Sequence, residues 1–417
     1  MLGRRSLGRR FRWLWTAYAV STVGTWLAFD AFPLIAIRVL HAGTTEVSVL
    51  AASGLAVAAA VAVPLGPWVE FRRKRPVMVT MDLIRCAALL SVPAAFALGR
   101  LGFAQLVVVS VVVGAADIAF TAAGGACLKA LVRPEDRLVA NGRFESTTWT
   151  ATVLGPPLGG AAIGLFGPVM TVTANAVSYL LSAVAIRAIG GREPRPARPE
   201  ASPRLRAGDL LDGWRHILAD AVLRPLFFNT VLVSGLIMAT MPLLAVLMLG
   251  TLGFTPWQYG LAFAVPCVGG LIGSRLASPL VNRFGRRGVL LTTGALRACW
   301  SLGLAFIGPG TAGLVLVMVV EFGLITCMGI FNPVFATYRL DRTPTDRVAR
   351  TLSAWSITSK ASIAALTALW GLLAAVTGPR TAIAIAGLLI MATPFLLPRR
   401  EDHPPRLAPE PSHSRTS

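Results

Sequence analysis

Residues 311–336 have the sequence TAGLVLVMVVEFGLITCMGIFNPVFA, in which Glu321 is the one charged residue. The hydrocarbon core of a bilayer is about 30 Å thick, and an α-helix crosses it with about 20 mostly apolar residues. This run is therefore long enough to span a membrane. Runs of similar length and character recur along the whole chain between short charged breaks, so the sequence predicts an all-α membrane protein.

The composition supports the same class. Hydrophobic residues make up 55% of the 417 residues, charged residues make up 14%, and the mean hydropathy is +0.67. Charged residues reach about 25% in ordinary soluble domains. The net charge of +20 could suit a nucleic-acid-binding surface, but the basic residues lie in short clusters between apolar runs. We expect a lipid bilayer around the chain and no nucleic-acid partner.

Charged breaks separate twelve apolar runs, in two sets of six. The first set lies near residues 14–37, 47–69, 77–98, 103–127, 144–165 and 168–186. The second set lies near residues 226–249, 257–281, 289–307, 311–336, 352–375 and 381–397. Arg72-Arg73 and Arg286-Arg287 recur at similar places in the two sets. Such a parallel duplication predicts twelve transmembrane helices in two six-helix pseudo-repeats around a central cavity.

The same breaks divide the chain into five regions. They are a basic N-terminal segment, a first six-helix bundle, a central loop, a second six-helix bundle and a tail, at residues 1–13, 14–188, 189–224, 225–397 and 398–417. In the central loop, apolar residues fall on one face of the stretch from Asp209 to Arg224, which predicts an amphipathic helix on the membrane surface. The tail is Pro-rich and polar, and we expect it to be disordered.

The distribution of basic residues predicts the orientation. If the N-terminus is inside, 32 of the 39 Lys and Arg residues fall in segments on that side, and only Arg38, Arg100 and Arg380 fall in outer loops. Basic residues are retained on the cytoplasmic side of short loops. We therefore expect both termini to be cytoplasmic. Only three of the basic residues are Lys, which is typical of a GC-rich bacterial genome, so the expected location is the bacterial inner membrane.

A sequence signature lies between the second and third spans. Residues 66–75 read GPWVEFRRKR, which resembles the Gly-xxx-Asp-Arg-x-Gly-Arg-Arg signature of the major facilitator superfamily of transporters. The positions that match in character are Gly66, Glu70, Lys74 and Arg75. Phe71 and Arg73 depart from the signature. The resemblance implies the major facilitator fold, with these four residues as gating candidates.

A second copy of the signature lies between the eighth and ninth spans. It keeps Arg283, Gly285, Arg286 and Arg287, and it has Asn282 in place of the acidic residue. These four retained residues are further gating candidates.

The fifth span contains a third family feature. Gly155, Pro156, Gly159 and Gly160 resemble the Gly-Pro-xx-Gly-Gly motif of the superfamily's antiporters. Small residues let helices approach closely, and proline bends a helix at a point that could act as a hinge. Ordinary tight packing is the alternative interpretation.

Three longer stretches resemble one branch of the superfamily, the enterobactin-exporter and macrolide-efflux type. They are residues 131–142 (LVRPEDRLVANG), residues 209–227 (DLLDGWRHILADAVLRPLF) and residues 332–339 (NPVFATYR), the last followed by Arg350. The resemblance covers essentially the whole chain. It implies a secondary transporter that exports its substrate.

Acidic residues inside predicted spans are candidates for transport. An ionisable group in the hydrocarbon region costs about 2.5 to 3.5 kcal/mol or more, and so suggests a function. Asp30, Asp117 and Glu321 lie in spans one, four and ten, which are cavity-lining spans in the superfamily. We predict that they bind protons or a positively charged substrate. Trp26, Phe29 and Phe32 bracket Asp30, and Trp26 and Phe29 are candidates for an aromatic substrate pocket.

The alternative for these acids is a structural ion pair with a buried base. Arg275, Arg297 and Lys360 lie within spans and are available as partners. Arg143 and Glu145, at the inner end of the fifth span, are candidates for a cytoplasmic gate. Asp82 and Arg85, three residues apart, predict a local ion pair.

The leading functional prediction is proton-coupled efflux of small amphipathic compounds, such as an antibiotic, a drug or a secreted metabolite, by alternating access. An importer of a small metabolite is the alternative. A membrane enzyme is disfavoured because the four histidines are scattered (His41, His216, His403 and His413) and suggest no catalytic or metal site. We expect no cofactor, a small-molecule substrate and protons as partners, and function as a monomer.

Overall fold

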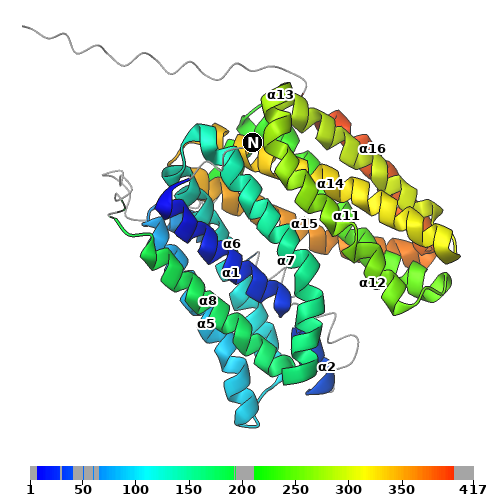
Figure 1. The fold of residues 1–417 in the computed structure, drawn as a ribbon, viewed down its shortest axis with the longest axis horizontal. Coiled ribbons are helices and arrows are strands. Elements are labelled where there is room, and N and C mark those ends of the chain that lie inside the picture. The colour runs from blue at the N-terminus through cyan, green and yellow to red at the C-terminus, as the bar shows by residue number, and fades with distance from the viewer. Residues whose placement is uncertain are drawn as a thin grey trace, which may run out of the picture.

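The computed structural model describes residues 7–28, 31–40, 50, 60, 65–191, 193 and 211–398. Over these residues the chain forms helices and no strands, arranged as two bundles that lie side by side (Figure 1). This confirms the predicted all-α membrane fold. Residues 399–417 of the predicted tail at 398–417, and most of the second span, lie outside the described residues.

Seven α-helices of the N-terminal bundle lie within the described residues. They are α1 (Gly8–Leu27), α2 (Ala31–Arg38), α4 (Leu65–Glu70), α5 (Lys74–Ala97), α6 (Phe103–Leu131), α7 (Arg137–Phe166) and α8 (Pro168–Ala188). Helix α5 packs against α6 and α8, and α1 packs against α7 and α8. Helix α7 ends at Gly167, whose φ of 80° favours glycine, and α8 begins at Pro168, which needs no amide partner at that position.

The C-terminal bundle follows a short helix, α10 (Asp212–Ala219). Its segments are α11 (Leu223–Ala245), α12 (Pro256–Ala264), α13 (Cys267–Trp300), α14 (Gly310–Arg342), α15 (Val348–Thr377) and α16 (Pro379–Ala392). Helix α13 contains both the eighth and the ninth predicted spans. The backbone breaks between them at Gly285, with φ 76° and ψ 157°, in the second copy of the loop signature.

The helices agree with the predicted spans wherever the structure describes them. Nine helices of the described part are long and apolar enough to cross a membrane, with the eighth and ninth spans counted there as one. Helix α7 adds the fifth span. Eleven of the twelve predicted spans thus correspond to described helices, and the second is represented only by its final turns in α4.

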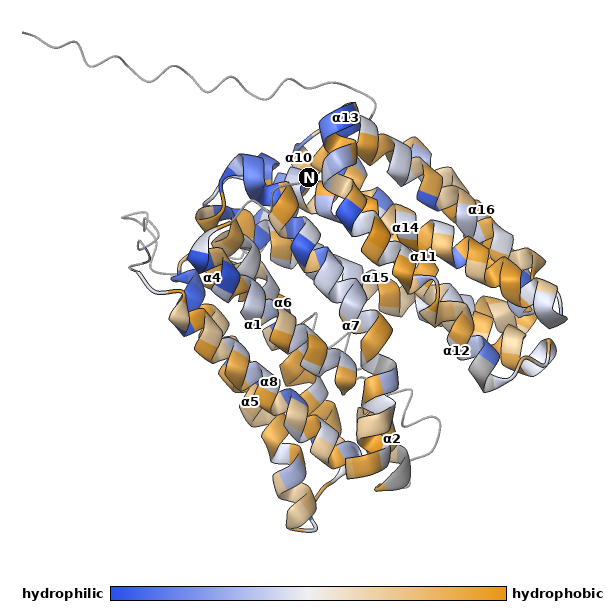
Figure 2. Ribbon diagram, viewed as in Figure 1, coloured by the Kyte–Doolittle hydropathy of each residue, from blue (hydrophilic) through white to orange (hydrophobic). Residues whose placement is uncertain are grey.

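The outer flanks of both bundles are apolar. Large hydrophobic side chains such as Leu180, Leu372 and Val376 are exposed, and hydrophobic residues cover the flanks of the helices (Figure 2). A soluble monomer rarely exposes apolar patches of more than a few hundred Å². These flanks therefore suit contact with lipid.

The predicted amphipathic helix is present as α10, and it packs against α15. Ile217 is fully buried, and the indole of Trp214 donates a hydrogen bond to the Thr358 hydroxyl at 2.9 Å. Gly213 lies against the backbone of Arg350, where a Cβ atom would overlap the carbonyl group. The apolar face of this helix is thus used for contact with the protein.

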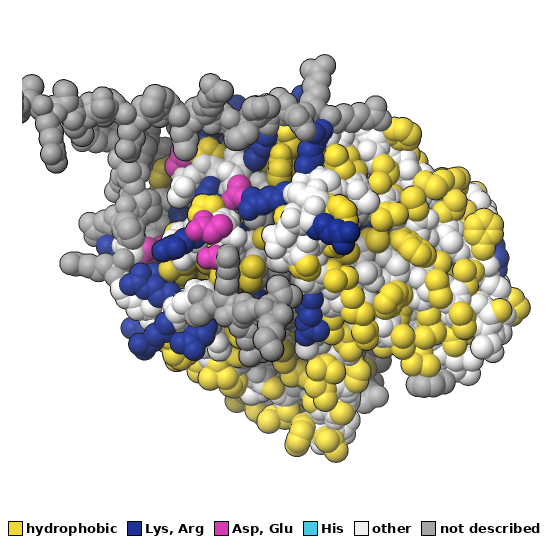
Figure 3. Space-filling model, turned by 45° about the horizontal axis from the view of Figure 1, so that its top comes forward, with side chains coloured by type: hydrophobic (Ala, Val, Ile, Leu, Met, Phe, Trp, Pro, Cys, Tyr) yellow, Lys and Arg dark blue, Asp and Glu magenta, His cyan; other side chains and the backbone are white. Residues whose placement is uncertain are grey.

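The two bundles meet at the end that carries α4 and α10 and diverge toward the end that carries α2 and α12 (Figures 1 and 2). Charged side chains of both signs gather on the end where they meet (Figure 3). There Arg137 of α7 pairs with Asp341 of α14 at 2.5 Å, and Asp341 also accepts from Arg286 at 2.7 Å. Lys129 of α6 donates to the carbonyl oxygen of Leu340 at 2.7 Å.

Glu70 contributes to the same contact from α4. Its carboxylate accepts a hydrogen bond from the backbone amide of Arg350 at 3.1 Å, in the first turn of α15. A carboxylate is favoured there because the first amides of a helix lack partners within the helix. Lys74 lies 3.9 Å from Glu70. Glu70 is only 5% exposed, and burial raises its pKa to about 7.

Glu70 should make stability depend on pH. The unfolded carboxyl has a pKa of about 4.5, so between pH 4.5 and 7 the folded chain keeps a proton that the unfolded chain has lost. The free energy of unfolding therefore falls as the pH rises through this window, by up to about 3 kcal/mol. We expect the melting temperature of the purified protein to fall between pH 5 and 8, and to fall less in Glu70→Gln. Parallel pH profiles for the two proteins would contradict this assignment.

The glycines of the fifth-span motif differ in their surroundings. A Cβ atom on Gly159 would overlap the carbonyl oxygen of Leu27, and one on Gly155 would lie 2.5 Å from the Cβ of Trp26. A Cβ atom on Gly160 would meet nothing within 4 Å. Two of the glycines thus allow α7 to approach α1 closely.

Substitution of these glycines provides a matched pair. Gly159→Val should lower the melting temperature, because overpacking costs about 1–3 kcal/mol, and Gly160→Val should leave it nearly unchanged. Thermal denaturation of both variants in the same detergent measures the difference. Equal losses would show that the close approach of α7 to α1 is not what requires glycine here.

Candidate functional site

A cavity of about 450 Å³ lies between the bundles. Its walls come from α1, α5, α6 and α7 on one side and from α14 and α15 on the other. Aromatic and hydroxyl side chains dominate the N-terminal wall, among them Tyr18, Thr22, Thr25, Trp26, Phe120, Thr121, Phe144 and Thr148. Such a mixture of flat apolar surfaces and few polar groups is typical of small-molecule sites.

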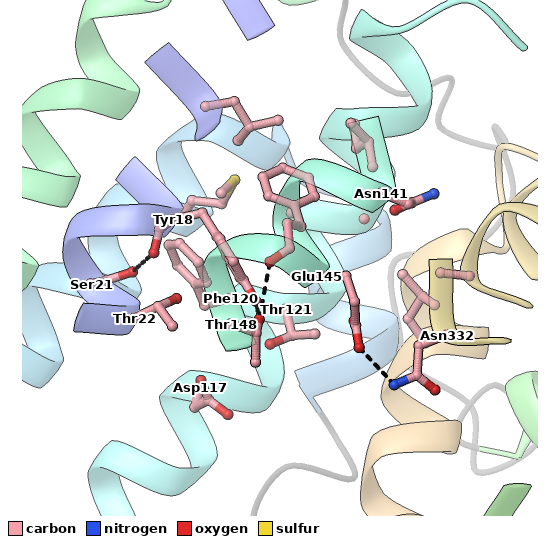
Figure 4. Close-up of a pocket in the computed structure, with 18 of the residues that line it drawn as sticks. Tyr18, Ser21, Thr22, Asp117, Phe120, Thr121, Asn141, Glu145, Thr148 and Asn332 are labelled. Atoms are coloured by element: carbon pink, nitrogen blue, oxygen red, sulfur yellow. Dashed lines mark hydrogen bonds between the residues drawn. The ribbon is translucent and has the colours of Figure 1, made fainter. Parts of the chain in front are cut away.

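Asp117 of α6 projects into this cavity and is 46% exposed (Figure 4). Its Oδ2 lies 3.0 Å from the Nζ of Lys360 of α15, and its Oδ1 lies 3.4 Å from the Nη1 of Arg85 of α5. The first ion pair joins the two bundles. The carboxylate is therefore held between one cation from each half of the molecule.

Arg85 is held more rigidly than the other members of this cluster. It is 3% exposed, its second guanidinium nitrogen pairs with Asp82, and its guanidinium lies 4.4 Å from the Phe120 ring and 4.2 Å from the Tyr179 ring. The predicted pair between Asp82 and Arg85 is thus present. Two acids and two bases give the cluster no net charge, and the partly exposed carboxylate of Asp117 is open to the cavity.

Glu145 of α7 also lines the cavity. Its Oε1 accepts hydrogen bonds from the indole of Trp149, one turn further along α7, at 2.9 Å and from the side-chain amide of Asn332 of α14 at 2.8 Å (Figure 4). The second bond crosses between the bundles. Glu145 therefore belongs both to the cavity wall and to the contact between the halves.

Hydrogen bonds fix the aromatic wall on the α1 side. The Tyr18 hydroxyl lies 2.7 Å from the Thr148 hydroxyl, and the Thr25 hydroxyl lies 2.9 Å from that of Tyr179. Trp26, one of the predicted pocket residues, lines the cavity at the last turn of α1. The other two predicted residues of this region, Phe29 and Asp30, lie outside the described residues.

Glu321 was predicted with Asp117, but the structure places it elsewhere. It lies on α14, is 2% exposed and is absent from the cavity lining. Its Oε1 has no hydrogen-bond partner among the described residues. Glu321 is buried within the C-terminal bundle.

The predicted bases differ in their surroundings. Arg297 is buried, donates to the side-chain oxygen of Asn229 at 2.5 Å and lies 3.7 Å from the Phe331 ring. Arg275 is exposed on α13, and the Arg143 guanidinium lies 5.7 Å from the Phe11 ring. Lys360 pairs with Asp117, as the structural alternative for this acid predicted.

The loop-signature residues lie at the charged end, outside the cavity. Lys74 donates to the carbonyl oxygens of Val69 and Glu70 at 2.9 and 2.6 Å, and Arg75 donates to that of Gly190 at 2.5 Å. Gly66 lies in α4 and Pro156 in α7. In the second copy, Gly285 forms the break already described, Arg286 pairs with Asp341, and Arg283 lies 5.3 Å from the Phe284 ring. Arg287 follows in the same segment.

Sequence reasoning missed three contributors to the site. Asn332 was noted only as part of a family-like stretch, and Tyr18 and Thr148 carried no signal because hydroxyl groups are common in membrane helices. The described residues also contain no group of three or more His, Cys, Asp or Glu side chains that could hold a metal ion.

Comparison with known proteins identifies relatives of similar size. The multidrug efflux pump Tap of Mycobacterium tuberculosis is 27% identical over 338 residues, which cover 77% of each chain. A bacterial homologue of the iron transporter ferroportin, solved in an outward-facing state, has a TM-score of 0.79 at 17% identity, over 93% of this chain and 98% of that one. The fucose:proton symporter FucP of E. coli has a TM-score of 0.68 at 13% identity, over 96% and 100%.

The sequence model of the Major Facilitator Superfamily matches residues 14–365 and again residues 226–416. Together the two matches extend over nearly the whole length of the chain. With the paired bundles and the cavity between them, they show that this protein is a transporter of the Major Facilitator Superfamily.

Proposed function

We propose that this transporter exports small amphipathic compounds in exchange for protons. The observation that carries the proposal is Asp117, a carboxylate that is partly exposed in a cavity with aromatic walls and paired with a cation from each half. The similarity to the multidrug efflux pumps named Tap supports efflux. The aromatic rings would contact the apolar part of a substrate.

The proposed orientation places the charged end in the cytoplasm. The reason is the strong enrichment of Lys and Arg in the segments that meet at this end. The bundles diverge toward the other end (Figure 1), so the cavity faces outward in this arrangement. The outward-facing state described for the ferroportin homologue, which has a similar fold, supports this interpretation.

Transport would proceed by alternating access. The two bundles would rock about the central cavity, so that the contacts at the charged end open while contacts at the other end form. The contacts at the charged end include ion pairs and single hydrogen bonds. Such contacts are suited to reversible opening because each contributes only a few kcal/mol or less.

Asp117 can exchange partners during this cycle. When the carboxylate is ionised it attracts Lys360 and Arg85, and a cationic substrate would compete with Lys360 for the same oxygen. When Asp117 is protonated it loses most of its attraction for any cation. A proton and a cationic substrate would then occupy the site alternately, and each proton entering supplies about 2.3 kcal/mol per 100 mV of membrane potential.

Removal of Lys360 tests this competition. Lys360→Met should tighten the binding of the amphipathic cation ethidium by about fivefold, because a competing pair worth about 1 kcal/mol at a partly exposed site is lost. Asp117→Asn should weaken binding, and Lys360→Arg should resemble the unchanged protein. Fluorescence titration of the purified proteins measures all three. Weaker ethidium binding by Lys360→Met would contradict the competition.

Proton flux tests the function itself. Inside-out vesicles that contain the protein are prepared with an acidic interior. They are then challenged with a panel of amphipathic cations and antibiotics. We expect substrate-dependent collapse of the gradient, with at least tenfold less in Asp117→Asn. Asp30→Asn, measured in parallel, tests the predicted acid of the first span. Movement of the substrate out of these vesicles corresponds to import into the cell, and it would favour a small-metabolite importer over an exporter.

A further inference from the structure

One face of α7 forms the deep part of the contact between the bundles. Asn141, Glu145 and Trp149 recur every four residues and so lie along one face of the helix. The Asn141 amide donates to the Thr337 hydroxyl of α14 at 2.8 Å. Trp149 covers Gly270 of α13, where a Cβ atom would overlap the indole ring. This row, which we name the α7 seam, lies beside the cavity, and Asn141 and Glu145 also belong to the cavity wall.

Glu145 is the acidic member of the α7 seam, and it also lines the cavity. A proton that enters the cavity can therefore reach a side chain that holds the two halves together. The bond to Asn332 runs between α7 and α14. The bond to Trp149 stays within α7 and fixes the direction of the carboxylate.

No ion pair compensates Glu145 within the part of the chain that the structure describes. The charged side chains that line the same cavity from neighbouring helices are Arg85, Asp117 and Arg339. Arg85 and Asp117 are engaged in the cluster described above. The Arg339 guanidinium lies over the rings of Phe335 and Trp355, at 5.1 and 5.0 Å.

The titratable group that faces Glu145 from α1 is Tyr18, whose hydroxyl is bonded to Thr148. On α7 itself, Arg143 lies near the Phe11 ring. From α14 the polar contact is the neutral amide of Asn332. The charge of the Glu145 carboxylate is therefore balanced chiefly by two neutral donors.

Protonation changes what this carboxylate can do. Hydrogen bonds to an ionised acceptor are roughly twice as strong as those between neutral groups. A protonated Glu145 keeps the same shape but holds the Asn332 amide less strongly. The bond between Glu145 and Asn332 is then weakened, while the bond between Asn141 and Thr337 is unchanged.

We propose that Glu145 is the residue at which proton entry is linked to opening of the charged end. In the ionised form it holds α7 against α14 and keeps the cavity closed on that side. In the protonated form it releases α14, and the bundles separate at the charged end. The inference rests on the proposed proton-coupled export, in which protons arrive from the outward-facing cavity. It separates the carboxylate that controls opening from Asp117, at which the substrate and a proton would alternate.

The test measures the separation of the bundles as a function of pH, with no substrate and no gradient. Spin labels are attached at Glu135→Cys and Asn282→Cys, two exposed positions of different bundles at the charged end, in a Cys299→Ala background. The other four cysteines are buried. Pulsed electron paramagnetic resonance gives the distribution of distances between the labels in lipid nanodiscs.

The unchanged chain should show mainly the short distance at pH 8. The ratio of long to short distances should rise about tenfold at pH 5.5, because one charge-assisted bond is replaced by a neutral one. Glu145→Gln should show the raised ratio at both pH values. Asn332→Ala, which removes the donor and leaves the acid, should lose the pH response in the same way. Asp117→Asn should keep it.

Three results would overturn the inference. The first is a pH response in Glu145→Gln equal to that of the unchanged chain, and the second is a response that disappears in Asp117→Asn alone. The third is the absence of any pH response in the unchanged chain. Because Asn332→Ala leaves Glu145 in place, a folding defect of Glu145→Gln would not prevent a decision.

A second measurement distinguishes this inference from the proposed function. In proteoliposomes, Glu145→Gln should lose export of ethidium driven by a pH gradient and keep exchange of ethidium across the membrane without a gradient. Equal gradient-driven export by the variant and the unchanged chain would reject Glu145 and leave proton-coupled export standing. A pH-dependent separation without any proton-coupled export by the unchanged chain would reject the proposed function and leave the role of Glu145 in opening.

Discussion

The Arg85 guanidinium sets the main electrostatic constraint on this structure. It lies almost fully buried among the helices of the N-terminal bundle, where an unpaired charge would cost several kcal/mol. Asp82 neutralises it from the same helix and Asp117 from the next one, and two aromatic rings cover its faces. Because Asp117 also pairs with Lys360, the constraint extends across the cavity to α15. One of the contacts between the bundles therefore depends on the charges in this small cluster.

The contact between the bundles changes in character along its length. At the charged end it combines ion pairs and side chains that bond to free backbone groups, as Glu70 does at the start of α15, with apolar packing of Leu340, Val348 and Leu352 against the N-terminal bundle. Deeper in, small and polar residues of α7, α13 and α14 approach closely, with Ser146 and Ser274 hydroxyls 2.7 Å apart. The cavity lies beside these turns, with Glu145 and Asn332 in its wall. The polar bonds of this contact can be broken and remade one at a time, because each contributes only a few kcal/mol or less.

The sequence predicted those features that depend on length and composition along the chain. Long apolar runs predicted the helices, the alternation of basic loops predicted which loops lie together, and the signature around Gly285 predicted the break within α13. Features that depend on helix rotation were harder to predict. Asp117 and Glu321 lie at comparable depths in their runs, yet one faces the cavity and the other is buried within its bundle. Both helices are apolar on nearly all sides, so periodicity could not fix their rotation.

The sequence also did not predict which residues pair across the two bundles. Lys360 lies 243 positions from Asp117, and no spacing rule connects residues of different bundles. Lys360 could be named as an available base, but Arg275 and Arg297 were equally available. The partners of Glu145 were missed for a related reason, since amide and indole groups are recognised as donors only once the helices are in place. The tertiary arrangement decides which of several chemically equivalent residues meet.

The energies involved fit an opening step controlled by few bonds. A proton moving down 100 mV of membrane potential supplies about 2.3 kcal/mol, and a hydrogen bond to a charged group contributes about 1.5–3 kcal/mol to stability. One proton can therefore offset one bond of the kind that Glu145 makes with Asn332, but it could not offset a whole interface. If Glu145 also bound the substrate, the substrate as well as the proton would change the strength of the bond to Asn332. Two carboxylates, one in the cavity wall between Arg85 and Lys360 and one in the α7 seam, allow substrate binding and opening to be driven by separate charges.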